Sequence, residues 1–184
     1  AQNRLPLRVY MIIPANLLDS TIGYRLNIDS ADSALRIGGA VIFADGYLSA
    51  RTAALFQPYG DSPAASGRLL YTQEEMKALA IKIRKASLQL VIHAMGDKAV
   101  DAALTTIEET SKKATTKDFR SRVEHAAVLN KGLLQRIKKQ KVIVSVQPRV
   151  IDSEFSVWSA TDHLGPERDR WLYPVKTLLK EDIK

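Results

Sequence analysis

Leu88-Gln-Leu-Val-Ile-His93 and Arg122-Val-Glu-His125 are the stretches of sequence that decide the fold. Each is a short apolar run that ends in a histidine. Each is followed by a turn of small residues and then by an amphipathic helical pattern. The distance along the chain between the two histidines is that of one strand–helix–strand unit. The sequence therefore predicts two consecutive parallel strands, each with a histidine at its carboxyl end.

The same alternation of strands and helices extends over most of the chain. Further strands are predicted over 7–13, 40–44 and 142–146. Helices are predicted to begin after the caps Thr72, Asp97 and Asn130, with Thr72 and Glu75 forming a capping box. A last helix is predicted over 172–180. Because the crossovers are long enough for parallel connections, we predict an α/β fold, a partial TIM barrel of about five parallel strands with outer helices.

The segments between these elements are less regular. Residues 15–36 are ambiguous and are expected to include a helix, while 149–170 is predicted to be a long loop. The connection over 45–70 is rich in glycine and proline, and connections of this length are usually functional or disordered.

Composition restricts the classes of protein. The 184 residues are 46% hydrophobic, enough for one core, and contain no cysteine, which excludes disulfides and a cysteine–zinc site. No apolar stretch approaches the ~20 residues of a membrane span, so no membrane partner is expected. The net charge of +7 comes from basic residues on predicted helix faces without interleaved aromatics, so we expect no nucleic-acid partner. The compartment stays open, with the cytoplasm slightly favoured.

The carboxyl ends of parallel barrel strands form the active-site face of such barrels. Two neutral imidazoles that converge there, His93 and His125, are typical ligands of a zinc-type metal. The structural alternative is that each is a core histidine bonded to a backbone carbonyl. Two imidazoles rarely hold zinc without a third ligand, so the isolated chain could lack a bound metal.

The sequence contains several short motifs in a defined order along the chain. They are Phe43-Ala-Asp-Gly46, Arg51-Thr-Ala-Ala-Leu55, Ile92-His-Ala-Met-Gly-Asp97, Arg122-Val-Glu-His-Ala126, Ser145-Val-Gln-Pro148 and Leu164-Gly-Pro-Glu-Arg168. In order and spacing they resemble the motifs of amidohydrolase family 3. This resemblance implies a metal-dependent hydrolase on a TIM-barrel scaffold, in which zinc activates water to cleave amide-like C–N bonds of a small molecule. It also implies that His93 and His125 ligate the metal.

The chain departs from the family pattern in three places. The His-x-His pair of the family's first strand is absent, and the last-strand Asp would follow shortly after Ile183. Val41 stands where the family has a lysine that bridges two metals. We therefore expect 1–184 to be a single domain, an internal fragment of a (β/α)8 barrel, whose parent binds one metal and which is inactive in isolation. The alternative is a non-catalytic paralogue or inactive fragment with no complete metal site.

Other polar residues have weaker assignments. Arg51 and Gln147 are candidate substrate-binding residues, although for Arg51 we favour the alternative that it holds its loop by an ion pair. Asp45 could make a turn or belong to the site. No catalytic acid or base can be assigned from the sequence.

The remaining expectations concern orientation and assembly. Glu124 should point away from His125, towards the helices, by strand alternation. His163 is expected at the surface, and Trp158 and Trp171 are expected to pack. An incomplete barrel exposes sheet edges, so we expect a homo-oligomer or self-association.

Overall fold

A single parallel sheet organises the molecule. The structure, a computed structural model, describes residues 7–21, 34–111, 120–147, 149 and 159–184. Its strands follow one another in chain order, and every neighbouring pair is parallel. They are β1 (Val9–Pro14), β2 (Leu35–Phe43), β3 (Gln89–Ala94), β4 (Arg122–His125) and β5 (Ile143–Ser145). The predicted five parallel strands are thus confirmed, with β2 longer and β5 shorter than expected.

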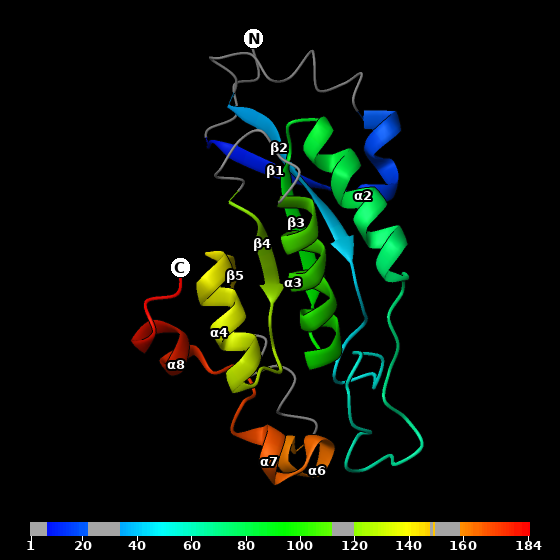
Figure 1. Cartoon of the computed structure of the whole chain (residues 1–184), viewed down its shortest axis with the longest axis vertical. Coiled ribbons are helices and arrows are strands. Elements are labelled where there is room, and N and C mark those ends of the chain that lie inside the picture. The colour runs from blue at the N-terminus through cyan, green and yellow to red at the C-terminus, as the bar shows by residue number, and fades with distance from the viewer. Residues whose placement is uncertain (1–6, 22–33, 112–119, 148, 150–158) are drawn as a thin grey trace.

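Three helices cover one face of this sheet: α2 (Gln73–Lys85), α3 (Asp97–Ser111) and α4 (Lys131–Gln140) (Figure 1). The predicted capping box is confirmed, since the Thr72 hydroxyl accepts from the Glu75 amide and the Glu75 carboxylate accepts from the Thr72 amide. Asn130 caps α4 as predicted. Asp97 is itself the first residue of α3, rather than the residue that precedes it.

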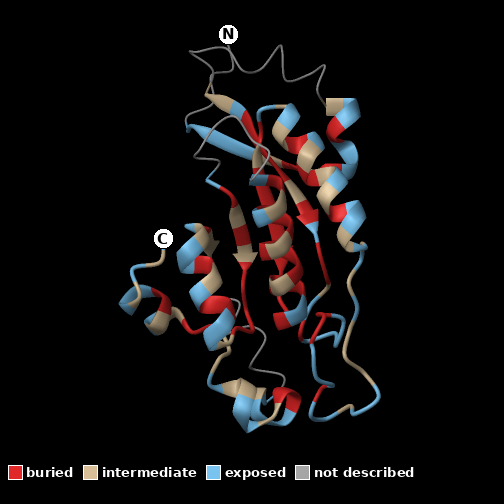
Figure 2. Cartoon of the chain, viewed as in Figure 1, coloured by how far each residue is buried: buried red, intermediate tan, exposed pale blue. Residues whose placement is uncertain are grey.

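The main core lies between the sheet and these helices, where Figure 2 shows the buried side of α3. The strand residues in this core alternate along the sequence and are aligned across the sheet, as in Ala40, Leu90, Ile92 and Val123. The residues between them, including Val41 and His93, therefore lie on the opposite face. This face is the one that would line the interior of a barrel.

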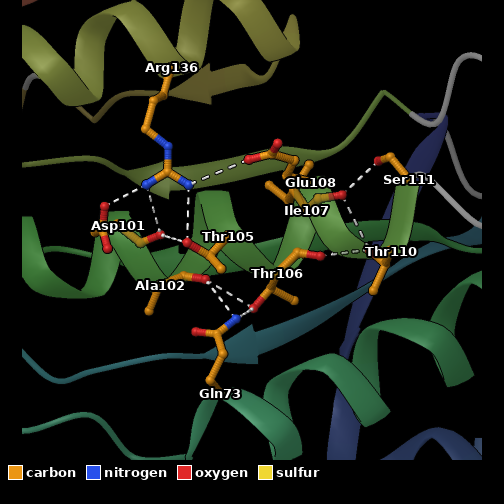
Figure 3. Close-up of polar contacts among 10 residues, drawn as sticks. All are labelled: Gln73, Asp101, Ala102, Thr105, Thr106, Ile107, Glu108, Thr110, Ser111 and Arg136. Carbon is orange, nitrogen blue, oxygen red and sulfur yellow. Dashed lines mark hydrogen bonds and ion pairs between the residues drawn. The ribbon is translucent and has the colours of Figure 1, made fainter.

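Polar side chains also join the helices to one another (Figure 3). Arg136 of α4 donates to the carboxylate of Asp101 and to the hydroxyl of Thr105, both on α3. Gln73 of α2 donates to the hydroxyl of Thr106 at 2.8 Å. The three helices therefore form one layer with fixed mutual positions.

A second layer covers the carboxyl ends of the strands. It comprises the connection over 45–70 and the helices α6 (Ala160–Leu164) and α7 (Pro166–Asp169), below the strand ends in Figure 1. Its own apolar cluster includes Leu48, Leu55, Tyr59 and Leu164. The connection is thus packed in place.

The remaining elements are short. The 3-10 helix η1 (Ala15–Leu17) follows β1, and α8 (Val175–Lys180) is shorter than the helix predicted over 172–180. The prediction of a loop over 149–170 is wrong in its described part, because Ser159 caps α6 and Pro166 begins α7. Trp171 packs against the main core as predicted, whereas Trp158 lies outside the described residues. No helix among the described ranges is long and apolar enough to span a membrane.

Candidate metal centre

His93 and His125 meet at the carboxyl ends of β3 and β4. Their ring centroids are 4.7 Å apart with the rings at 74°, and both residues are buried, at 3% and 7% exposure. Strand alternation alone would not bring them together, because His125 is aligned with Ala94, on the helix side of the sheet. His125 instead adopts a left-handed conformation with φ of 70°, which turns its side chain towards His93. The predicted convergence of the two histidines is therefore present.

Burial keeps this pair neutral. It lowers the pKa of His93, an effect that the Gly46 carbonyl and Glu124 oppose. Burial and the neighbouring His93 lower the pKa of His125 to about 4. Neutral imidazoles carry the free lone pair that a metal requires.

Asp45 holds the connection over 45–70 against the end of β3. Its buried carboxylate accepts hydrogen bonds from the backbone N–H groups of Ala54 (2.9 Å), Met95 (3.0 Å) and Gly96 (2.9 Å). Burial raises the pKa of Asp45 to about 6, while these three donors act in the opposite direction. One carboxylate oxygen lies 3.8 Å from Nε2 of His93. Asp45 therefore both forms the turn and borders the site.

Gly96 allows this close approach of the two segments. A Cβ atom at Gly96 would lie 1.9 Å from the carbonyl oxygen of Ala54. Only glycine fits there without a shift of the backbone.

The predicted orientation of Glu124 is wrong. Glu124 is aligned with His93 across the sheet and so lies on the same face as His93. Its carboxylate pairs with Arg122, two residues earlier on the same side of β4. The error has a physical cause, since the left-handed turn at His125 interrupts the alternation on which the prediction depended.

Arg51 forms an ion pair within its own loop, as expected if its role is structural. Its guanidinium donates to both carboxylate oxygens of Asp61, at 3.1 and 2.7 Å. Binding of a substrate by Arg51 stays a prediction. Gln147 is exposed just beyond β5, and its predicted role in substrate binding also stays a prediction.

His163 was expected at the surface, and this prediction is wrong. It lies on α6 with 2% exposure, its Nδ1 atom 2.5 Å from the Asp61 carboxylate and its Nε2 atom 3.2 Å from the Leu48 carbonyl oxygen. It therefore joins α6 to the long connection and is separate from the His93–His125 pair.

Two aromatic residues beside the pair were not foreseen. The ring centroids of Phe43 and Tyr47 each lie 5.4 Å from that of His93, and Tyr47 lies 6.5 Å from His125. Phe43 could have been inferred from the strand register, because it is aligned with His93. Tyr47 lies in a connection whose path no local pattern predicts.

The histidine pair fits a divalent metal in its donor chemistry. Nδ1 of His125 is buried without a hydrogen-bond partner, which is costly unless a ligand occupies it. Within the described ranges, however, no group of three or more His, Asp or Glu residues is placed to hold a metal ion. The two histidines would therefore supply part of a coordination shell.

The comparisons with known proteins identify the family. The model of the amidohydrolase family matches residues 1–184. This chain belongs to the amidohydrolase family. The resemblance drawn from its motifs is thus confirmed.

Similar amidohydrolases and related proteins are much longer than this chain. The chain is 34% identical over 149 residues to the protein named amidohydrolase YtcJ of Bacillus subtilis, covering 81% of this chain and 27% of YtcJ. It is 30% identical over 170 residues to protein LONG AFTER FAR-RED 3 of Arabidopsis thaliana, covering 91% of this chain and 29% of that protein. It is 26% identical over 155 residues to an N-substituted formamide deformylase of Arthrobacter pascens. This match covers 82% of this chain and 27% of the deformylase.

Solved structures show the same fold. Crystal structures of uncharacterized metal-dependent hydrolases from Pyrococcus furiosus and Pyrococcus horikoshii each match with a TM-score of 0.81 and 37% identity. The match to the Pyrococcus furiosus structure covers 96% of this chain and 35% of that protein chain. The match to the Pyrococcus horikoshii structure covers 94% of this chain and 34% of that one. The fold of this amidohydrolase-family chain is therefore a partial α/β barrel with outer helices. Two expectations stay predictions. One is that the barrel closes into an eight-stranded TIM barrel, and the other is that the chain is a single domain.

Proposed function

We propose that this chain supplies two metal ligands, His93 and His125, to a hydrolase that cleaves amide-like C–N bonds of small molecules. The observation that carries the proposal is the 4.7 Å contact of the two rings at the carboxyl ends of adjacent parallel strands. In α/β barrels this end bears the catalytic groups. The family and the names of the relatives, an amidohydrolase, a formamide deformylase and metal-dependent hydrolases, support this reaction class.

The proposed cofactor is a divalent metal, zinc, which when bound lowers the pKa of water and polarises a carbonyl group. The chain's own residues hold the two imidazoles in place. His93 is fixed between the Gly46 carbonyl, 3.3 Å from its Nε2 atom, and the rings of Phe43 and Tyr47. His125 is fixed by the left-handed end of β4. We propose that Gln147, which is exposed just beyond β5, donates a hydrogen bond to substrate.

Arg51 is the second proposed substrate contact. Its guanidinium is held by Asp61 through two hydrogen bonds, and its side chain is 42% exposed. A substrate carboxylate would therefore have to share this guanidinium with Asp61. Among the two substrate-binding candidates, this makes Gln147 the less restricted one.

Val41 favours a single metal. It lies on the same face as His93, two residues before Phe43 on β2. A valine has neither the length nor the oxygen needed to bridge two ions, so one metal is expected, and one metal suffices to activate water.

A non-catalytic role is the second candidate. Val41 and the lack of a third ligand among the described residues favour it. In that case His93 and His125 would be core residues with no affinity for metal. The two candidates therefore differ in a property of this chain that can be measured directly.

The test uses the histidine ring signals of the full chain. The sequence contains three histidines, so a zinc titration followed by NMR should perturb the signals of His93 and His125 and leave that of His163 unchanged. His93→Ala and His125→Ala should each weaken zinc binding on the order of tenfold or more, since loss of an outer-sphere partner alone costs about that much. Zinc that perturbs no histidine, or only His163, would contradict the proposal.

A further inference from the structure

Tyr47 is a half-exposed aromatic residue in contact with the histidine pair. Its side chain contacts both imidazoles edge-on, with ring centroids 5.4 Å from His93 and 6.5 Å from His125. The histidines are almost fully buried, but Tyr47 is 48% exposed and Phe43, which also contacts His93, is 42% exposed. A molecule that approaches the two imidazoles would therefore meet an aromatic surface.

The backbone of Tyr47 is fixed before any ligand arrives. Its N–H group donates to the Thr52 hydroxyl at 2.9 Å, and its carbonyl oxygen accepts from the N–H groups of Thr52 (3.0 Å) and Ala53 (3.1 Å). The preceding Gly46 lies so close to Thr52 that a Cβ atom would be 2.1 Å from the hydroxyl oxygen. Because its backbone is held and a tyrosine side chain has few rotatable bonds, Tyr47 can bind a ligand with little loss of conformational entropy.

From this arrangement we propose that Tyr47 determines substrate specificity by binding a planar, apolar substituent, such as an aryl group, next to the amide bond. The inference rests on the proposed function, because it assumes that the amide approaches His93 and His125. Aromatic rings prefer edge-to-face or offset contacts, which a half-exposed ring beside a buried polar pair can offer. Phe43, whose ring also contacts His93, adds exposed apolar surface beside the pair.

The test compares two primary amides that differ only in their substituent, benzamide and acetamide. Their dissociation constants are measured by NMR titration of the metal-free full chain. Benzamide should bind the unmodified chain about tenfold more tightly than acetamide, the size expected of an aromatic contact. Tyr47→Ala should remove this preference, because it should weaken the binding of benzamide more than that of acetamide, whereas Tyr47→Phe should retain the preference.

Phe56 provides a matched control. It belongs to the same connection, is 53% exposed, and has no ring contact with His93 or His125 in the described structure. Phe56→Ala should retain the preference for benzamide. Circular dichroism of each variant detects any loss of folding. If Tyr47→Ala does not fold, Tyr47→Phe is compared with the unmodified chain instead.

Two results would overturn the proposal: equal binding of both amides to the unmodified chain, or a preference for benzamide that survives in Tyr47→Ala. The zinc titration of the histidine signals is a separate measurement. If zinc perturbs His93 and His125 but the amides are not distinguished, the specificity role fails and the proposed function stands. If the amides are distinguished and zinc has no effect, the metal-dependent function fails.

Discussion

Asp61 of the connection over 45–70 binds both Arg51 of the same connection and His163 of α6 through one carboxylate. It accepts two hydrogen bonds from Arg51 and lies 2.5 Å from Nδ1 of His163 on α6. The hydrogen bond from Arg51, and then the proximity of His163, hold the pKa of Asp61 below its ordinary value of 3.8. A group with a lowered folded pKa stabilises the fold above its unfolded pKa, and this contribution disappears as the pH falls through the folded pKa.

Asp61→Asn should therefore destabilise the chain by about 1–2 kcal/mol at neutral pH, or a few degrees in Tm. The difference in Tm between the chain and this variant should be constant above about pH 5 and should shrink as the pH falls below 3.8 towards the lower pKa of folded Asp61. Thermal unfolding followed by circular dichroism measures both. The exposed pair Glu167–Arg170 supplies the control, since Glu167→Gln should have almost no effect. A Tm difference that does not shrink as the pH falls below 3.8 would contradict the role of the Asp61 charge.

At the residue scale, the sequence predicts contacts that repeat with the strand–helix unit and misses those made by irregular backbone. The convergence of His93 and His125 could be predicted because both end consecutive parallel strands. The face of Glu124 could not, because it depends on the left-handed conformation of His125. The burial of His163 could not either, because it depends on Leu48 and Asp61, which are far away in the sequence.

At the element scale, α2 shows how local chemistry sets a helix boundary. Thr72→Ala removes one side of the capping box, which should cost about 1 kcal/mol of unfolding free energy. Thr72→Ser keeps the hydroxyl and should stay close to the original stability. Urea denaturation of the two variants makes the comparison, and equal losses would show that the methyl group of Thr72, rather than its hydrogen bonds, stabilises the helix.

Elements with such local signals were predicted well. The caps at Thr72 and Asn130 and the strand Arg122–His125 need only neighbouring residues to be recognised. The short helices α6 and α7 were missed because five and four residues are too few to show a helical period. Their stability comes from packing of residues such as Leu164 against the long connection.

At the scale of the whole molecule, the edge strand β1 of the described sheet favours association. β1 is an edge strand in the described sheet, and its residues Val9, Tyr10 and Met11 are exposed at 40%, 49% and 38%. Exposed edge strands pair with other chains. We propose that this chain self-associates through β1.

Light scattering should therefore return a mass above the 20.4 kDa of one chain. Met11→Lys places a charge on the edge and should shift the population towards the monomer. Leu179→Lys, at a 73% exposed position on α8, should leave the mass unchanged. A mass near that of one chain at high concentration would contradict the proposal, and an equal effect of both variants would assign the association to a surface other than β1.

The left-handed backbone of His125 has a consequence for how this chain can change over time. Histidine adopts this conformation at a cost of about 1–2 kcal/mol, whereas glycine would adopt it readily. Replacement of His125 by glycine would therefore relieve this cost and, under the proposed function, would remove a metal ligand. If the proposed function holds, stability and metal binding oppose each other at this position.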